Sequence, residues 1–393
     1  MTLRSLDLFH VAVPLRKPIR HASFERSSSA NLVVRVTLAS GRVGFGEGVP
    51  RPYVTGETIE STFATLAGVD AARLVGDARD YGEVVDRLGR WTLPEAEADP
   101  RGMAGNSARC ALELAILDAY GREFGESIGR AVRQLGAGGG VLNDAPTAVR
   151  YSGAITADSG RKERVAAWKM RLYGFEQVKL KVGVAGQDDP ARLAALRKIL
   201  GRRMDLRLDA NEAWRAVDLR ERVRPLLAFG PSALEQPLPH GEVEALAELR
   251  PGLGVPVMLD ESLCGLPDAA RAVERGLADI LNVRLSKCGG IAASLRIMAL
   301  ARRSGLGVQL GCHPGETGLL SAAGRHLAAN VAGIRYLEGS YDRHILAENL
   351  TTLDITFGYG GRAAPLAGPG LGVAVDPERL QRMTVARREI RHD

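Results

Sequence analysis

Residues Val178-Lys179-Leu180-Lys181-Val182 alternate apolar and basic side chains, which predicts a short β-strand with both lysines on one face. The apolar face of such a strand packs against helices, so we expect the two lysines to point into the interior of a barrel. Lysine is rarely buried without a partner. Two ammonium groups this close disfavour each other's charge, which predicts a lowered pKa for one of them and a role as general base.

The next three predicted strands each end on an acidic side chain. Asp209, Glu235 and Asp260 lie 26 and 25 residues apart, which is one strand-plus-helix unit each time. Acids at the carboxyl ends of adjacent parallel strands meet at one mouth of a barrel. Three oxygen ligands there suit Mg²⁺, with Mn²⁺ as a possible substitute. The alternative interpretation is that each acid caps the helix that follows it.

Residues 141–350 repeat this strand–helix alternation, which predicts a parallel (β/α) barrel. A doubly wound sheet is the alternative, but no strand is followed by a Gly-x-Gly-x-x-Gly turn that opens a helix. Eight apolar strands are expected near residues 149–155, 176–182, 205–210, 233–236, 256–260, 280–286, 307–312 and 334–339.

An α+β unit precedes the barrel over residues 1–140. The β-branched run 32–38 predicts a strand, residues 60–135 read as helices, and the glycines of 136–140 mark a linker. Helix 108–124 carries its apolar residues at the spacing of one face. Residues 351–393 are expected to pack back on this first unit.

Composition excludes several classes of protein. The net charge is +6, but arginine is spread along the chain and aromatic residues make up only 5%, which argues against a nucleic-acid partner. No apolar stretch reaches the roughly 20 residues of a membrane span. Residues 1–20 lack the apolar core of a secretory signal, and the four cysteines form no Cys-x-x-Cys pair. These features predict a cytoplasmic protein that does not bind membranes.

Taken together, the motifs resemble the muconate lactonizing enzyme subgroup of the enolase superfamily, within the mandelate racemase/muconate lactonizing enzyme family. The specific part is Lys-x-Lys followed by the three acids, and the looser parts are 46–48, 53–57, 111–118, 316–318 and 368–373. The resemblance covers almost the whole chain. It implies a modified (β/α)₇β TIM barrel under an α+β capping domain, and a homo-oligomer, dimer or octamer.

The resemblance also implies residue roles. Asp209, Glu235 and Asp260 would bind Mg²⁺, Lys181 would be the acid/base, and Lys179 would tune it. The substrate would be a small carboxylate that reacts through a metal-stabilised enolate. A lysine base that works together with Mg²⁺ is a general feature of this superfamily.

One position departs from the family pattern. The subgroup places a second catalytic lysine on the sixth strand, and by register from Asp260 that position here is Arg284. Lys287 lies close by, but on strand parity it falls on the helix-facing side. Arginine stays protonated at neutral pH, so it stabilises negative charge but is a poor base. We therefore expect one-base chemistry, with Lys181 moving the proton and Arg284 holding developing charge.

Further residues are expected to contact the substrate. Dipeptide epimerases hold an ammonium group with Asp-x-Asp on the eighth strand, and residues 337–342 do not match that motif. The basic loop 16–26 suits an anionic substrate. The expected substrate contacts are Asn211, His313, Glu316, Glu338, Arg20 and Tyr53.

The expected activity is that of a cycloisomerase. A lyase, either a syn dehydratase or an o-succinylbenzoate synthase-like enzyme, is the first alternative, and a racemase or epimerase follows if a second base exists. Two rivals come from other classes: a Schiff-base aldolase, and a catalytically disabled barrel that binds a carboxylate.

Overall fold

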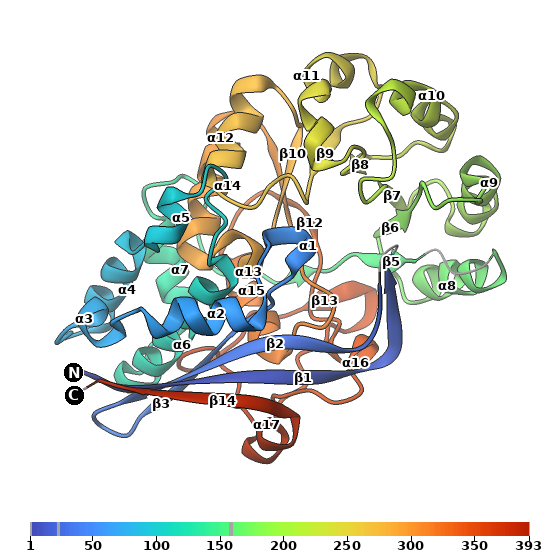
Figure 1. Ribbon diagram of the computed structural model, residues 1–393. Helices are drawn as coiled ribbons and strands as arrows, with labels where there is room; N and C mark the ends of the chain where they lie inside the picture. The colour runs from blue at the N-terminus through green and yellow to red at the C-terminus, as the bar shows by residue number, and fades with distance from the viewer. Residues whose placement is uncertain (1, 22–23, 157–159, 393) are drawn as a thin grey trace.

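The computed structural model describes residues 2–21, 24–156 and 160–392, although the side chains of residues 19–21 and 24–25 lie outside that description (Figure 1). An antiparallel sheet and its helices form one part of the molecule, and a ring of parallel strands with outer helices forms the other. Both chain termini lie at the antiparallel sheet (Figure 1).

The first part, the cap, is built on a four-stranded sheet in the order β14-β1-β2-β3, with neighbouring strands antiparallel. The run 32–38 lies in β2, as predicted, and alternate residues such as Val34 and Val36 are fully buried. The strands are β1 (Leu3–His21), β2 (Phe24–Leu38), β3 (Val43–Gly48) and β14 (Thr384–Arg391).

Helices cover one face of this sheet, and α6 lies at their centre. A single apolar face was the expectation for α6, yet its residues 106–121 are buried on all sides. The reason is close packing, since a Cβ on Gly46 of β3 would lie 2.1 Å from the Ala111 carbonyl oxygen. The cap helices are α1 (Pro52–Thr55), α2 (Ile59–Ala67), α3 (Ala71–Val75), α4 (Tyr81–Arg90), α5 (Pro94–Ala98), α6 (Asn106–Phe124) and α7 (Ile128–Gly136).

The second part is an eight-stranded parallel sheet in the sequential order β5 to β12. The Ser152 amide, just before β5, donates to the Leu337 carbonyl of β12 over 2.7 Å and so joins the first and last strands. The predicted barrel is confirmed. Its strands are β5 (Gly153–Ile155), β6 (Gln177–Lys181), β7 (Asp205–Asp209), β8 (Ala233–Glu235), β9 (Val257–Leu259), β10 (Ile280–Val283), β11 (Gly307–Leu310) and β12 (Ile334–Leu337).

Two predicted strands are too long. Residues 149–150 form β4, which pairs with β13 (Arg362–Ala363) rather than continuing into β5. The expected strand 280–286 ends at Val283, because residues 285–288 turn into the short helix α13. The second difference changes the side-chain directions in the site.

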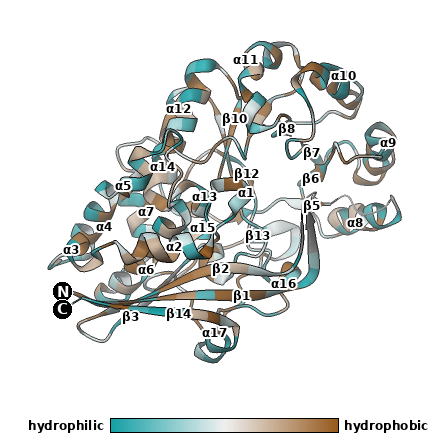
Figure 2. Ribbon diagram, in the orientation of Figure 1, coloured by the Kyte–Doolittle hydropathy of each residue, from teal (hydrophilic) through white to brown (hydrophobic). Residues whose placement is uncertain are grey.

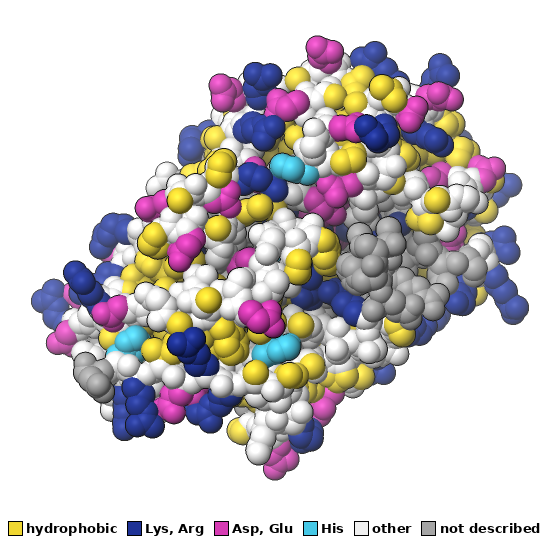
Figure 3. Space-filling view, viewed as in Figure 1, with side chains coloured by type: hydrophobic (Ala, Val, Ile, Leu, Met, Phe, Trp, Pro, Cys, Tyr) yellow, Lys and Arg dark blue, Asp and Glu magenta, His cyan; other side chains and the backbone are white. Residues whose placement is uncertain are grey.

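Seven helical connections join the eight strands, which is the (β/α)₇β pattern. Figure 2 shows hydrophilic residues along outer helices such as α12, and Figure 3 shows basic and acidic side chains mixed over one face rather than gathered by sign. The helices are α8 (Gly160–Leu172), α9 (Asp189–Leu200), α10 (Leu219–Val223), α11 (Leu246–Leu249), α12 (Leu266–Arg275), α13 (Leu285–Cys288), α14 (Ile291–Arg303) and α15 (Gly318–Asn330).

Short 3₁₀ segments and the C-terminal elements complete the chain. The 3₁₀ segments are 216–218, 224–229, 240–245, 250–252 and 359–361, and the late helices are α16 (Asp342–Ile345) and α17 (Pro377–Met383). Strand β14 then pairs with β1 in the cap sheet (Figure 1). None of the helices in the described ranges is both long and apolar enough to cross a membrane.

A buried carboxylate ties the cap to the barrel. Glu47, at the end of β3, accepts hydrogen bonds from the amides of Thr317 and Leu320 in the first turn of α15, and from the Asn31 side chain. A carboxylate at a helix N-terminus satisfies amides that otherwise lack partners. This contact fixes the cap over the loop that follows β11.

Candidate active site

The lysine pair lies where the sequence predicts. Val178 and Leu180 of β6 are buried while Lys179 and Lys181 are partly accessible, so the two sets face opposite sides of the strand. Lys181, Asp209 and Glu235 are register partners on β6, β7 and β8. These three side chains therefore lie at the same level of the barrel, on three adjacent strands.

Lys179 is an internal counter-ion. Its Nζ lies 3.2 Å from Asp209 Oδ2, 3.5 Å from Glu235 Oε1 and 3.0 Å from Glu338 Oε1. Burial alone lowers the pKa of Lys179, but these three carboxylates outweigh burial and place the pKa well above its usual range. Lys179 is therefore not the lysine of the pair whose pKa is lowered.

The three predicted ligands converge through shared cations. Lys179 lies against Asp209 and Glu235, while the Arg284 guanidinium contacts Asp260 and comes within 3.9 Å of Glu235 Oε1. The Asn282 amide also donates to Glu235 Oε1 over 2.9 Å. Three consecutive strand ends thus present their acids to one region of the mouth.

The chemistry of this donor set fits a divalent cation. Five carboxylates (Asp209, Glu235, Asp260, Glu261, Glu338) meet four cationic side chains (Lys179, Arg207, Arg284, Lys287). Burial raises the pKa of Glu235 to about 7, and the Oε2 atoms of Glu235 and Glu261 have no hydrogen-bond partner among the described residues. A bound metal ion stabilises buried carboxylate oxygens that lack hydrogen-bond partners.

The acids of the described residues do not form a ready metal-binding cluster. Within residues 2–21, 24–156 and 160–392, no three Asp, Glu, His or Cys side chains stand close enough to hold a metal ion as they are. Lys179 and Arg284 lie between the acids. A bound ion would compete with these two cations for the same oxygens.

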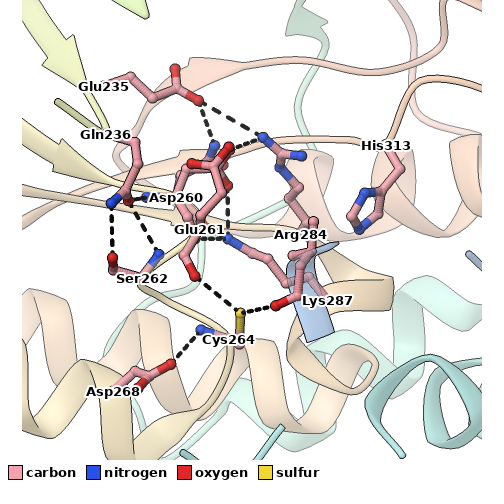
Figure 4. A network of polar contacts seen from close by, with 12 residues as sticks. Glu235, Gln236, Asp260, Glu261, Ser262, Cys264, Asp268, Arg284, Lys287 and His313 are labelled. Carbon is pink, nitrogen blue, oxygen red and sulfur yellow. Dashed lines mark hydrogen bonds and ion pairs between the residues drawn. The ribbon is translucent and has the colours of Figure 1, made fainter. Parts of the chain in front are cut away.

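Lys287 points into the site, contrary to the prediction. Its Nζ donates to the Asp260 carbonyl (2.6 Å), to Asp260 Oδ1 (2.8 Å) and to the Asn282 carbonyl (3.0 Å), as Figure 4 shows in part. Strand parity does not apply to it, because β10 ends at Val283 and α13 turns Lys287 back toward Asp260. An ammonium group has three donors, and here each has an acceptor.

Replacing Lys287 by methionine is therefore expected to destabilise the protein by about 3–5 kcal/mol, because it leaves a buried carboxylate and two carbonyls without their donor. Urea unfolding of the metal-free protein measures this loss. Lys198→Met on α9 is the matched control, since Lys198 is exposed and its removal should change stability by less than about 0.5 kcal/mol. Equal losses in the two variants would show that Lys287 does not hold Asp260.

Glu338, one of the predicted substrate contacts, forms ion pairs inside the barrel. Its carboxylate contacts both Lys179 and the Arg207 guanidinium. Burial opposes ionisation of Glu338, but Lys179 and Arg207 outweigh it and lower the pKa to about 2. Both anionic oxygens are thus already neutralised by internal partners.

Sequence reasoning missed Arg207, Gln236 and Glu261. Arg207 shares the inward parity of Asp209 on β7, stacks 4.6 Å from the centre of the Tyr336 ring and lies 3.4 Å from Glu235 Oε2. Gln236 accepts from the Asp260 amide over 2.9 Å and donates to Ser262 Oγ over 2.8 Å. The parity rule that found the lysines would have found Arg207, whereas no sequence signal marks the bonds of Gln236.

The other predicted contacts fall around this network. The Asn211 amide side chain donates to Glu261 Oε1 over 3.3 Å. His313 lies beside Arg284 (Figure 4), and burial, followed by Arg284, lowers its pKa well below the usual value. Burial raises the pKa of Glu316 to about 8, and its Oε1 accepts from the His313 amide over 2.6 Å.

The other two predicted contacts belong to the cap. Tyr53 is on α1 with 45% of its surface exposed. Arg20 lies outside the described side chains, so its position relative to the mouth stays a prediction.

Comparison with known proteins adds the family context. Residues 162–379 match the model described as "Enolase C-terminal domain-like", and residues 4–131 match "Mandelate racemase / muconate lactonizing enzyme, N-terminal domain". The L-Ala-D/L-Glu epimerase of Clostridium acetobutylicum is 30% identical over 84% of this chain and 87% of its own. Muconate cycloisomerase 1 of Rhodococcus opacus is 28% identical over 98% and 99%.

A solved structure with the same fold is the dipeptide epimerase of Cytophaga hutchinsonii, complexed with Mg and the dipeptide D-Ala-L-Val. It superposes with a TM-score of 0.81 at 24% identity, covering 99% of this chain and all of that one. Epimerases, racemases and cycloisomerases all occur among the relatives.

Proposed function

Because the chain belongs to the mandelate racemase/muconate lactonizing enzyme family and is an isomerase of the enolase superfamily, we propose that it uses Lys181 as its single acid/base on a small carboxylate, as a cycloisomerase does. The observation that carries the proposal is the residue at the position of the family's second lysine. That residue is Arg284, which is held by Asp260 and lies near Glu235.

Arg284 and Lys287 both pair with Asp260, which favours their charged forms in the metal-free site. Burial alone lowers the pKa of Arg284, but Asp260 and Glu261 outweigh it and hold the guanidinium charged well beyond its ordinary range. Asp260 likewise outweighs burial and raises the pKa of Lys287, whose three donors are already bonded. These charged forms disfavour racemisation, which needs a neutral base on one face of the substrate.

Asp209, Glu235 and Asp260 are the residues that would hold Mg²⁺, or Mn²⁺ in its place. The ion would supply positive charge to the substrate carboxylate, which stabilises the charge that forms when the α-carbon loses or gains a proton. Gln236 and Lys287 orient Asp260 for this role through their bonds to its backbone and carboxylate.

Lys181 is the group placed to move the proton. It is the register partner of Asp209, and no hydrogen bond or ion pair between its Nζ and another described residue is present. Its amine thus differs from that of Lys179, which three carboxylates hold. Arg284 supplies a fixed positive charge that stabilises negative charge developing on the substrate.

An epimerase is the second candidate, because several relatives carry that activity. The acids that follow the eighth strand argue against a dipeptide substrate. Glu338 is paired with Lys179 and Arg207, and Asp342 accepts from Ser321 Oγ (2.6 Å) and from the Asn349 side chain (2.8 Å). Neither acid is left to receive a substrate ammonium group.

Reaction in D₂O with Mg²⁺ distinguishes the candidates. Cycloisomerisation of an unsaturated dicarboxylate gives a lactone with one deuterium on a single face, whereas a syn elimination gives an alkene and water from a hydroxy acid. Epimerisation instead places deuterium at the α-carbon of both stereoisomers of an amino-acid derivative. That last result would overturn the one-base proposal, and the absence of product from all three kinds of acid would favour a barrel that only binds.

The substitution Arg284→Lys tests whether residue 284 decides between one-base and two-base chemistry. It restores an ionisable amine at the position of the second base, so α-proton exchange of an N-acyl amino acid should rise at least about tenfold over the wild type. Arg284→Met removes the guanidinium without adding a base and should show no such gain. Equal exchange in the two variants would mean that the identity of residue 284 does not decide the reaction.

A further inference from the structure

The cap helix α6 contacts the loops at the barrel mouth. Three of its buried side chains, Asn106, Arg109 and Glu113, are spaced three and four residues apart and so lie on one face of the helix. The helix packs against α13, the short helix that carries Lys287. The cap therefore touches the segment from which Lys287 reaches Asp260.

The Asn106 side chain joins two of these loops. Its Nδ2 donates to the Cys264 carbonyl and to the Lys287 carbonyl, each over 2.8 Å. Cys264 follows β9 and Lys287 follows β10, so one amide group links the segments after two adjacent barrel strands. A side-chain amide has two N–H donors, and here both are used. Asn106 is only 4% exposed, so water does not readily replace these bonds.

These bonds close a ring of contacts around Asp260. Cys264 comes shortly after Asp260 in the chain, and Lys287 Nζ donates to the Asp260 carbonyl over 2.6 Å and to its Oδ1 over 2.8 Å. Figure 4 shows Cys264 and Lys287 beside Asp260. A displacement of either loop would move Lys287 relative to Asp260 and so change the direction of a predicted metal ligand.

Two glycines after α13 allow the cap helix to come this close. Gly289 has φ +85°, and a Cβ there would lie 2.6 Å from Asn106 Oδ1. Gly290 has φ +97°, and a Cβ there would overlap the Glu113 carboxylate. That carboxylate accepts from the Ala292 amide over 2.9 Å, in the first turn of α14. The turn after α13 thus has the backbone shape that the contact with α6 requires.

We propose that Asn106 is a positioning residue of the metal centre, through which the cap holds Lys287 against Asp260. This role rests on the proposed Mg²⁺ site and makes its affinity depend on a residue from the other part of the molecule. Without the amide, two buried carbonyl groups lose their donor, and the loops after β9 and β10 are no longer held together. Asp260 then loses its fixed orientation and binds the ion less tightly.

Electron paramagnetic resonance of the whole chain titrated with Mn²⁺ measures this dependence without any substrate. Asn106→Leu removes both donors at similar side-chain volume and is expected to weaken Mn²⁺ binding at least about tenfold. Asn330→Leu is the matched control, because Asn330 is a similarly buried asparagine whose Nδ2 donates to a carbonyl, that of His326 in α15. It should lose stability but keep its Mn²⁺ affinity within about twofold of the wild type.

Hydrogen exchange supplies a readout that a merely structural role would not change. Coupling between metal binding and the contact of α6 with α13 is reciprocal, so Mg²⁺ should slow amide exchange in residues 285–290 of the wild type. This protection should be reduced in Asn106→Leu and kept in Asn330→Leu. Thermal melting checks that each variant folds, and Asn106→Ala, which removes the same two donors with a smaller side chain, carries the test if Asn106→Leu does not.

Three results would contradict the assignment in different ways. Unchanged Mn²⁺ affinity in Asn106→Leu would show that Asp260 is oriented without the cap, and equal weakening in Asn330→Leu would reduce the effect to lost stability. A wild type that binds no Mn²⁺ tightly would instead overturn the metal centre itself, and the positioning role with it.

Discussion

Lys181→Ala is expected to lower kcat/KM by about 10²- to 10⁴-fold, which is the contribution of a positioned general acid/base. Lys181 lies one strand from Asp209 at the same level of the barrel, on the face of β6 opposite Val178 and Leu180. The substrate for the measurement is whichever acid exchanges hydrogen in D₂O with the wild type. Deuterium incorporation should disappear with the loss of turnover, since both need the same proton carrier.

The matched comparison is Lys179→Met, because the two lysines share a strand face but differ in their surroundings. Lys179 neutralises Asp209, Glu235 and Glu338, so its loss should appear first as reduced stability in urea. Lys181→Ala should unfold at nearly the wild-type urea concentration. An inactive Lys181→Ala variant that is also strongly destabilised would assign Lys181 a structural role instead.

Asp209→Asn is expected to weaken Mg²⁺ binding by at least about 100-fold and to remove activity at ordinary Mg²⁺ concentrations. A carboxylate is a far better ligand for this hard cation than an amide, and Asp209 lies at the centre of the series Lys181–Asp209–Glu235. EDTA should abolish the wild-type activity, and added Mg²⁺ should restore it. Calorimetric titration with MgCl₂ gives the affinity directly.

Asp205→Asn serves as the control, since Asp205 begins the same strand and lies at its opposite end. Its effect on Mg²⁺ affinity should be less than about twofold because no other predicted ligand is near that end. Activity that survives EDTA in the wild type would contradict a metal-dependent reaction and would favour Schiff-base chemistry.

The architecture could be predicted because each barrel strand leaves its own local signal. Short apolar runs such as 205–209 alternate with helical stretches, and the acids at their ends recur at the period of one strand–helix unit. The inward direction of Lys179 follows from the two-residue period of a strand, which holds wherever the strand is regular. The domain limits at residues 140 and 350 remain predictions.

The prediction for Lys287 was wrong because strand periodicity was carried past the end of the strand. The chain leaves β10 at Val283, and the four-residue helix α13 reverses the direction in which Lys287 points. Arg284 still follows the strand pattern because its backbone is extended, with φ −125° and ψ 129°. A one-turn helix followed by two glycines leaves little trace in hydrophobic periodicity.

Polar contacts between residues far apart in the sequence could not be predicted either. The ion pairs of Glu338 with Lys179 of β6 and Arg207 of β7 were not predicted, because they cross the closure of the sheet between β5 and β12. Such pairs join residues 159 and 131 positions apart, so no local pattern reports them.

Electron paramagnetic resonance of the wild-type protein titrated with Mn²⁺ tests the central claim most directly, because it counts bound ions without needing the substrate. The geometry predicts one tight Mn²⁺ per chain, displaced by Mg²⁺ and lost in Glu235→Gln. A wild-type protein that binds no Mn²⁺ tightly, or a Glu235→Gln variant that keeps its ion, would contradict a metal centre formed by the acids at the ends of β7, β8 and β9.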